Sequence, residues 1–267
     1  RTAMEPWTRE MGILYDQMDS PPCCWLQYRV LNASLPMCAH DDDAVSNSIS
    51  RSGRFHHCKG LPAMWTRELG LGNAGTHHLE LGANIGSCVL EMLLATDAKI
   101  VAVEPSPSNL HRLTSTLSAL PSPYASRVTL YPFAAGNVSE DLQLYSQKGN
   151  WGNSVLGHPV KDGPKAVMRS PVTVPVRSLD SLLGGRASGV QFRTVKMDVQ
   201  GFECKALQGA NKLLSNPSQG RSIRTEFAKR HLQRQGCDLY GSLRALGYTR
   251  LHPAKVPTRL TEVYGHK

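Results

Sequence analysis

Residues 76–95 read THHLELGANIGSCVLEMLLA, and this stretch decides the fold. Its first six residues, 76–81, have the composition of a short strand, and residues 82–86 form a turn with a glycine at each end. Residues 87–95 then place apolar side chains at helical spacing. A strand, a glycine-bearing turn and a helix in this order are typical of open α/β sheets, in which ligands bind at the turn.

The same alternation continues towards the C-terminus. We expect strands at residues 99–103, 127–133, 194–198, 221–227, 248–251 and 261–264, and helices at residues 108–120, 203–214 and 239–246. Short links between them favour a parallel sheet that is covered on both faces. The sequence therefore predicts a Rossmann-like α/β fold with a mostly parallel seven-stranded sheet and helices on both faces.

One segment interrupts this rhythm. Residues 142–145 and 172–176 alternate between apolar and polar side chains, as an antiparallel pair of strands would. Residues 149–154 between them read GNWGNS, which predicts a long loop. Long loops inside a compact domain are often functional, so we expect this one to contribute to a site.

The N-terminal residues differ from the rest. Residues 1–60 are rich in turn formers, and we expect them to be an extension that packs on a main domain of residues 61–267. Short helices are expected at residues 7–17 and 45–50. No run of about 18 apolar residues occurs, so no membrane span is expected. The first residue is Arg1, and we expect a native N-terminus upstream, where a signal or anchor could stand.

The chain is basic, with a net charge of +9 over 267 residues and a pI near 9.3. Such a charge indicates either a basic surface that aids solubility or attraction to an acidic partner. Dense Lys/Arg runs and alternating basic and aromatic residues are absent from the sequence, and aromatic residues make up 6% of it. We therefore do not expect a nucleic-acid partner.

Seven cysteines give no C-x-x-C pair and no zinc spacing. Four of them lie in the N-terminal region and could form disulfides in an oxidising compartment: Cys23, Cys24, Cys38 and Cys58. We expect Cys88 and Cys204 to be small core residues. Glycosylation sequons begin at Asn32 and Asn137. These features favour a secretory route, with the Golgi lumen as the expected compartment, over the cytoplasm.

The glycine turn excludes the common phosphate-binding motifs. The positions of a G-x-G-x-x-G fingerprint hold Gly82, Asn84 and Ser87, so NAD and FAD are not expected, and no Gly-Lys-Ser/Thr of a Walker loop follows. The turn instead reads E-x-G-x-x-x-G. S-adenosylmethionine (SAM) has no phosphate but has a zwitterionic methionine tail, which a chain bending at glycines can approach closely.

Two carboxylates support this interpretation. Glu80 would place negative charge near the ammonium group of SAM, directly or through water. Glu104 ends the next strand, where a carboxylate can accept hydrogen bonds from ribose hydroxyls. The predicted cofactor-binding residues are Glu80, Gly82, Ala83, Asn84, Gly86, Glu104, Pro105, Ser106 and Ala134. The alternative is an α/β domain without a nucleotide, whose glycines serve packing alone.

Three motifs resemble those of the FkbM family of methyltransferases. Residues 80–86 (ELGANIG) are similar to the family's D-x-G-A-N-x-G, residues 104–107 (EPSP) to its E-P-x-P, and residues 196–203 (KMDVQGFE) to its K-x-D-V-E-G-x-E. Two departures are Glu80 in place of Asp and Gln200 in place of Glu. The resemblance spans residues 76–251. It implies a class I methyltransferase fold, SAM as the methyl donor, and O-methylation, often of sugar or polyketide hydroxyls.

A hydroxyl acceptor benefits from a general base. Asp198, at the end of a predicted parallel strand, is our first candidate, although it could instead cap the following helix. Glu226 could bind acceptor, and His231 could be the base or a solvated helix residue. Asn153 and Ser154 could contact acceptor or simply form the turn. Asp198 with Glu226 could coordinate Mg²⁺, although nothing in the spacing requires a metal.

These residues together predict a SAM-dependent O-methyltransferase. Its expected acceptor is a hydroxyl of a sugar, a glycan or another small molecule. The alternatives are an RNA or protein methyltransferase, which the positive charge would suit, and a binding module that keeps the fold without catalysis. The oligomeric state stays open.

Overall fold

The structure is a computed structural model, and it describes most of the chain. The described residues are 22–69, 76–160, 166–183, 190–216, 222–226, 229–250 and 261–266. The helix expected at residues 7–17 lies outside them.

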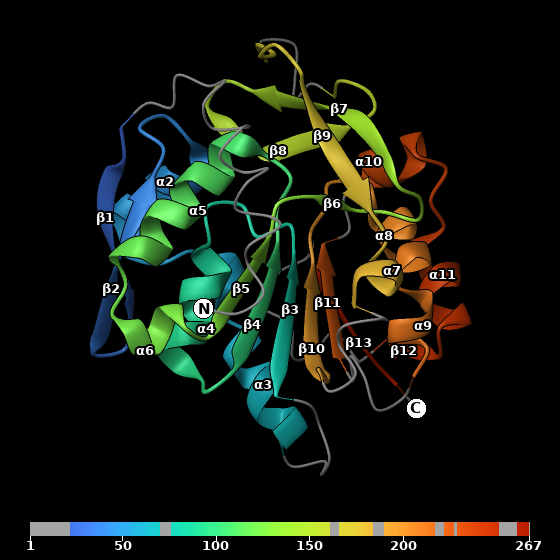
Figure 1. The fold of residues 1–267 in the computed structure, drawn as a ribbon, viewed down its shortest axis with the longest axis horizontal. Coiled ribbons are helices and arrows are strands. Elements are labelled where there is room, and N and C mark those ends of the chain that lie inside the picture. The colour runs from blue at the N-terminus through green and yellow to red at the C-terminus, as the bar shows by residue number, and fades with distance from the viewer. Residues whose placement is uncertain are drawn as a thin grey trace.

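A seven-stranded sheet forms the centre of the molecule, with the strand order β12-β13-β11-β10-β3-β4-β5 (Figure 1). Its strands are β3 (His77–Leu81), β4 (Lys99–Val103), β5 (Val128–Tyr131), β10 (Phe192–Met197), β11 (Ser222–Glu226), β12 (Tyr248–Arg250) and β13 (Thr261–His266). The five strands from β11 to β5 pair in parallel, whereas β13 runs antiparallel to both of its neighbours. The predicted α/β fold is confirmed, and its sheet is mixed.

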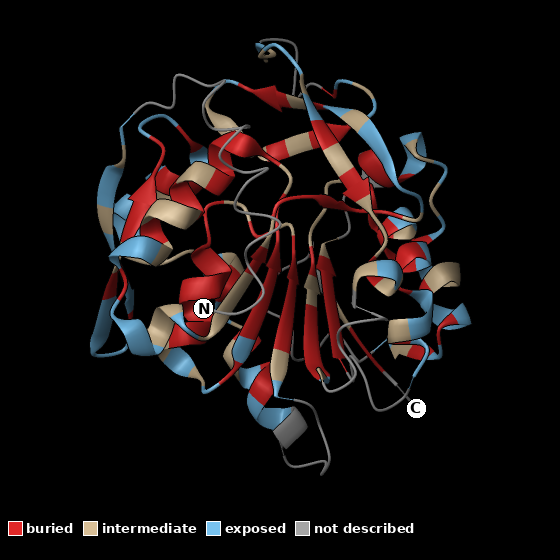
Figure 2. Ribbon diagram, in the orientation of Figure 1, coloured by how far each residue is buried: buried red, intermediate tan, exposed pale blue. Residues whose placement is uncertain are grey.

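Helices cover both faces of this sheet. The helices of the described residues are α2 (Ala44–Ser52), η1 (His56–Cys58), α3 (Leu61–Leu69), α4 (Ser87–Ala95), α5 (Pro107–Ala119), α6 (Ser122–Ala125), α7 (Leu179–Leu183), α8 (Glu203–Gly209), α9 (Asn211–Leu214), α10 (Lys229–Arg234) and α11 (Leu239–Ala245). Successive side chains of a strand point to opposite faces. Ile100 and Ala102 of β4 accordingly join the apolar cluster of α4 and α5, whereas Val101 and Val103 join that of α8 and α11. The sheet is thus buried from both sides (Figure 2).

The N-terminal region packs on the main sheet's helices. Strands β1 (Cys24–Val30) and β2 (Ala33–Ala39) form an antiparallel hairpin, and the backbone amide of Cys38 donates to Thr116 Oγ1 of α5 at 2.9 Å. The helix expected at residues 45–50 is α2, and the Asp43 carboxylate caps it by accepting from the amide of Ser46.

A smaller sheet lies beyond the carboxyl ends of the parallel strands (Figure 1). It consists of β6 (Ala134–Ala135), β7 (Glu140–Gln147), β8 (Asn150–Leu156) and β9 (Val172–Arg177), in the order β6-β9-β7-β8. The predicted antiparallel pairing is found, with Leu142 opposite Val174. The loop predicted at residues 149–154 is wrong, because most of it belongs to β8. Glycine and asparagine are poor strand formers, but β7 pairs with this segment and Asp43 accepts from the amide of Trp151.

Three disulfides link the described cysteines. They are Cys23–Cys38, Cys58–Cys88 and Cys204–Cys237, and Cys24 is free and exposed. The prediction that Cys88 and Cys204 are plain core residues is therefore wrong. Their partners lie 30 and 33 residues away in sequence, and the fold, rather than a spacing motif, brings them together.

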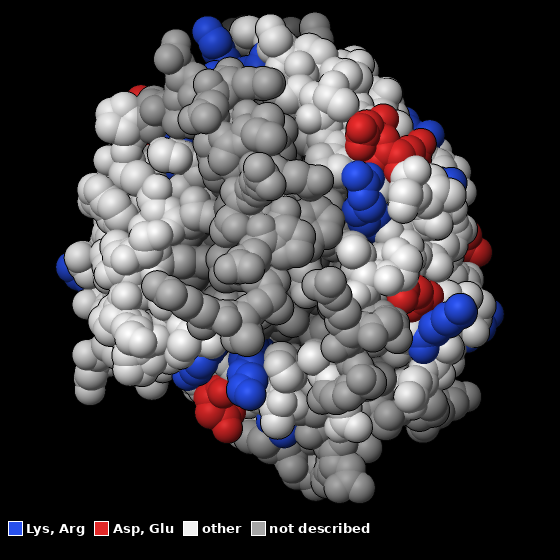
Figure 3. All heavy atoms as spheres, in the orientation of Figure 1, with Lys and Arg blue, Asp and Glu red and all other residues white. Residues whose placement is uncertain are grey.

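Charged side chains on the visible face lie singly or in small groups of both signs (Figure 3). On the described part of that face, no continuous basic track is seen. Among the described helices, none has both the length and the apolar character needed to cross a bilayer.

The Cys58–Cys88 bond joins η1 to α4 and should be a main contributor to stability. Replacing both residues with alanine should lower the free energy of unfolding by about 3 to 4 kcal/mol, because a cross-link over a loop of this length restricts the unfolded chain. Chemical denaturation followed by circular dichroism would measure the loss. Cys24→Ser is the control, and an equal loss in both proteins would contradict the assignment.

Candidate active site

The turn between β3 and α4 needs glycine for two reasons. Gly82 and Gly86 have φ of 78° and 90°, in the left-handed region that side chains disfavour. A Cβ on Gly82 would also lie 1.9 Å from the backbone oxygen of Asp198. The turn after β3 and the loop after β10 therefore touch at their backbones. Asn84, at φ 53°, completes the bend.

Glu104 ends β4 as predicted, and its carboxylate is buried. Oε2 accepts from the amide of Asn84 at 2.8 Å, and Oε1 accepts from the amide of Ser106 at 2.9 Å and from Asn109 Nδ2 at 3.2 Å. Burial raises the pKa of Glu104, and these hydrogen bonds act against that rise. A carboxylate has about four acceptor positions, so one on Oε2 is left for a ligand hydroxyl.

A cavity that is partly open to solvent lies between this turn and the smaller sheet. It is lined by Gly82, Asn84, Val103, Glu104, Pro105, Asn109, Phe133, Ala134, Ala135, Leu144, Trp151, Gly152, Ser154, Leu156, Asp198, Val199, Gln200 and Phe202. Five of the predicted cofactor residues are in this lining. The other four, Glu80, Ala83, Gly86 and Ser106, are not in it.

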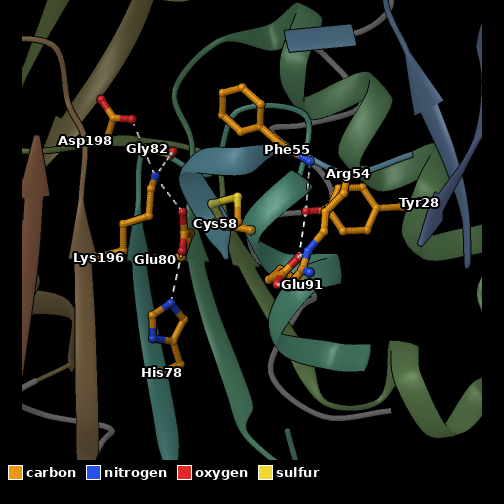
Figure 4. The surroundings of a disulfide bond; sticks show 11 residues. Tyr28, Arg54, Phe55, Cys58, His78, Glu80, Gly82, Glu91, Lys196 and Asp198 are labelled. Carbon is orange, nitrogen blue, oxygen red and sulfur yellow. Dashed lines mark hydrogen bonds and ion pairs between the residues drawn. A yellow bond between two sulfur atoms is a disulfide. The ribbon is translucent and has the colours of Figure 1, made fainter. Parts of the chain in front are cut away.

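The carboxylate of Glu80 is engaged by other side chains. Its Oε1 lies 2.7 Å from Lys196 Nζ and its Oε2 lies 3.0 Å from His78 Nε2 (Figure 4). The parallel register of β3 with β10 places Glu80 beside Lys196. The carboxylate is buried and does not line the cavity. Its role near the ammonium group of SAM, directly or through water, stays a prediction.

Asp198 and Glu226 form a carboxylate pair at the ends of β10 and β11. Gln200 Nε2 donates to Asp198 Oδ1 at 2.7 Å and to Glu226 Oε2 at 3.2 Å. The charge of Asp198, together with desolvation, raises the pKa of Glu226 to about 8. Desolvation alone would raise the pKa of Asp198, but Lys196 and hydrogen bonds from Glu226 and Gln200 lower it. At neutral pH, Glu226 therefore carries a proton and Asp198 is ionised.

This arrangement does not support Mg²⁺ at the pair. The amide of Gln200 donates to one oxygen of each carboxylate, where a cation would otherwise coordinate. Within the described part of the chain, no group of three or more metal-ligating side chains is found.

A second, smaller cavity, with enclosed room for about one water molecule, adjoins the carboxylate pair. It is lined by His57, Lys196, Met197, Asp198, Arg224 and Glu226. Asp198 lines both cavities and therefore stands at their junction. Desolvation lowers the pKa of His57, which favours its neutral form. Sequence reasoning missed His57, Lys196 and Arg224, although Lys196 opens the third motif.

Of the three remaining predicted site residues, one lines a cavity and two do not. Ser154 lines the first cavity, and its Oγ lies 2.8 Å from Ser146 Oγ. Asn153 is buried in β8 and lines neither of the two cavities. His231 is also buried outside both linings, where its backbone and Cβ pack against Gly201. His231 is therefore packed in the interior, and the alternative of a solvated helix residue is wrong.

Glu203, the last residue of the third motif, is another residue that sequence reasoning missed. It is buried, and its Oε1 accepts from the amide of Val199 at 3.3 Å. Burial raises the pKa of Glu203 to about 7. This carboxylate holds the loop that carries Asp198.

A glycine turn and a strand-tip carboxylate at the edge of an α/β sheet define a cofactor-binding domain of the nucleotide-binding class. Residues 80–250 match the family model of the methyltransferase FkbM domain. The chain belongs to the FkbM methyltransferase family, as its motifs suggested.

Solved structures with a similar fold were also found. The FkbM methyltransferase of Methylobacillus flagellatus KT is 20% identical over 73% of this chain, with a TM-score of 0.48, and this chain covers 44% of its length. The magnesium protoporphyrin IX methyltransferase of Synechocystis PCC 6803, solved with bound SAM, is 10% identical, with 86% of each chain covered and a TM-score of 0.44. A comparison with curated proteins gives no match.

The carboxylate pair predicts a pH effect on stability. The folded chain holds the Glu226 proton more tightly than the unfolded chain does, so this contribution is full below about pH 4.5 and is lost as the pH rises through about 8. Glu226→Gln keeps the neutral form at every pH. Its free energy of unfolding, relative to the wild type, should therefore increase across this interval in denaturation series. Glu140→Gln, at an exposed carboxylate of β7, is the control, and parallel curves for all three proteins would contradict the shared proton.

Proposed function

We propose that the chain is a SAM-dependent O-methyltransferase that acts on a hydroxyl of a sugar, a glycan or another small molecule. The observation that carries the proposal is the position of Asp198, which lines both the larger cavity at the glycine turn and the smaller cavity beside it. A methyl donor in the first cavity would meet, at this carboxylate, an acceptor hydroxyl that reaches it from the side of the smaller cavity.

The residues of the larger cavity fit SAM. Glu104 has one acceptor position left for a ribose hydroxyl. Phe133 and Pro105 give the cavity apolar walls of the kind that an adenine ring needs. Gly82 and Asn84 bend the chain around the space for the methionine tail. When bound, the cofactor supplies an electrophilic methyl group on a sulfonium.

The chain's own residues would orient the acceptor and take its proton. Asp198 would accept the proton of the acceptor hydroxyl, while the bound cofactor would supply the methyl group. Lys196, with its Nζ 3.7 Å from Asp198 Oδ2, keeps this carboxylate ionised and ready. Gln200 fixes its orientation from the other side. Alignment of the two reactants carries much of the rate in such a displacement.

The N-terminal extension supports the site as well as the fold. Asp43 Oδ1 accepts from the amide of Trp151 at 2.9 Å, and Trp151 lines the larger cavity. The ring of His40 stacks on Trp151 with centroids 4.7 Å apart. We therefore include the extension in the functional unit.

We also propose a secretory location, in the Golgi lumen. Three disulfides among the described residues are typical of oxidising compartments. The sequon residue Asn32 is exposed at the tip of the β1–β2 hairpin, where a glycosyltransferase could reach it.

Cofactor binding can be tested without knowing the acceptor. Glu104→Gln should weaken binding of S-adenosylhomocysteine about 10- to 100-fold, because a hydrogen bond to a charged group is lost. Isothermal titration calorimetry would measure the change, with Glu140→Gln as the control for the same chemical substitution at an exposed site. Equal affinity in wild type and Glu104→Gln would count against the proposed cofactor site.

Asp198→Asn tests the base. Turnover should fall about 10²- to 10⁴-fold, which is the usual contribution of a general base, while the affinity for S-adenosylhomocysteine stays within a few-fold. The assay is transfer of tritium from methyl-labelled SAM to pools of glycans, small hydroxylated molecules, peptides and RNA. Cofactor binding without transfer to any pool would favour a binding module, and transfer to RNA or peptide would replace the proposed acceptor class.

A further inference from the structure

His40, which follows β2 in the N-terminal extension, is a buried histidine beside the larger cavity. It is 2% exposed. Its Nε2 lies 3.0 Å from Asn109 Oδ1 of α5, and its ring stacks on that of Trp151 of β8 with the two planes 9° apart. Asn109 and Trp151 both line the larger cavity, whereas His40 does not. The extension therefore contacts two walls of this cavity through one side chain that lies outside its lining.

The hydrogen bonds of the Asn109 side chain run in one direction. Its Nδ2 donates to Glu104 Oε1 at 3.2 Å, because an ionised carboxylate can only accept. The amide oxygen then faces His40, so Nε2 carries the ring proton and donates it. Desolvation lowers the pKa of His40 to about 3, and the charges of Arg112 and Arg169 act in the same direction. The ring is therefore neutral at physiological pH, with its one N–H directed at Asn109.

The backbone around His40 is held by the same strand as its ring. The backbone amide of His40 donates to Ser46 Oγ at 3.1 Å, and this hydroxyl donates to Asp43 Oδ2 at 3.2 Å. Asp43 Oδ1 accepts in turn from the backbone amide of Trp151. Because both the ring and the backbone of residues 40–46 are connected to β8, the fold fixes the direction of the Nε2–H bond.

We propose that His40 is a positioning residue of the cofactor site, which fixes the amide of Asn109 and thereby the carboxylate of Glu104. This inference rests on the proposed function, in which Glu104 accepts a ribose hydroxyl. A half-turn of the Asn109 amide would place Oδ1 against the carboxylate, where two acceptors repel. The same half-turn would place Nδ2 against the His40 N–H, where two donors meet. His40 thus opposes the half-turn, and Glu104 keeps Oε1 bound to Asn109 and Oε2 available to the ribose.

A matched pair of variants tests the donor. His40→Phe keeps a ring that can stack on Trp151 but removes the N–H, whereas His40→Gln keeps a donor near the position of Nε2. In isothermal titration calorimetry with S-adenosylhomocysteine, His40→Phe should bind about 3- to 10-fold more weakly than the wild type, as expected for the loss of one hydrogen bond. His40→Gln should recover most of this loss. The control is His77→Phe, at a half-buried histidine that begins β3 outside the cavity lining, and it should bind as the wild type does.

A double-mutant cycle separates positioning from general support of the fold. Asn109→Ala removes the group through which His40 is proposed to act. Adding His40→Phe to Asn109→Ala should therefore change the affinity by less than about 2-fold, because residues that act through one another are not additive. Losses that multiply, or equal affinity in the wild type and His40→Phe, would overturn the inference and leave the proposed function standing. If the wild type does not bind S-adenosylhomocysteine, both fail.

The tautomer of His40 gives a second measurement, which needs no cofactor. In NMR of the free chain with isotope-labelled histidine rings, at about pH 8, where histidines are neutral, the signal that is missing from His40→Gln should come from a ring protonated at Nε2. A ring protonated at Nδ1 could not donate to Asn109 and would overturn the inference. This measurement still decides the matter if His40→Phe fails to fold.

Discussion

Lys196 lies between the carboxylates of Glu80 and Asp198, and this contact joins the two halves of the site. Its Nζ also lies 3.5 Å from the backbone oxygen of Gly82, in the glycine turn (Figure 4). Desolvation would lower the pKa of Lys196, but Glu80 and Asp198 raise it, so the ammonium stays charged. Removing one partner of an enclosed ion pair leaves the other uncompensated. The turn at the larger cavity and the carboxylate at the junction are thus fixed by one cation.

An amide, Gln200, stands in this chain at the position where the motif that it resembles has a glutamate. Its left-handed backbone, with φ of 52°, turns the side chain towards both Asp198 and Glu226, to which a glutamate could donate nothing. A third carboxylate at this point would add a like charge and raise the pKa of its neighbours further. The amide lets two acids share one proton while one of them remains ionised. The substitution is therefore compatible with a working base.

The features that depend on local sequence patterns could be predicted from the sequence. The β3 turn, α4 and the acid at the end of β4 follow from periodicity and glycine spacing over a few residues, and they stand where expected. The partner of Glu80 could not be predicted, because it depends on the register of β3 against β10, a strand distant in sequence. The same holds for Arg224, whose guanidinium lies beside Gly60, a residue distant in sequence. Strand β8 was missed because its pairing with β7 overrides poor strand propensities.

The disulfides connect the fold to the site in a way that composition did not suggest. Cys58 ends η1, the element that carries His57 into the lining of the smaller cavity, and its partner Cys88 lies in the first turn of α4, directly after the glycine turn. The ring of Phe55 stacks on His57 with centroids 4.9 Å apart and fixes it further. One covalent bond therefore sets the distance between a wall of the smaller cavity and the turn of the larger one. In an oxidising compartment, both cavities are held in register by the same bond that stabilises the fold.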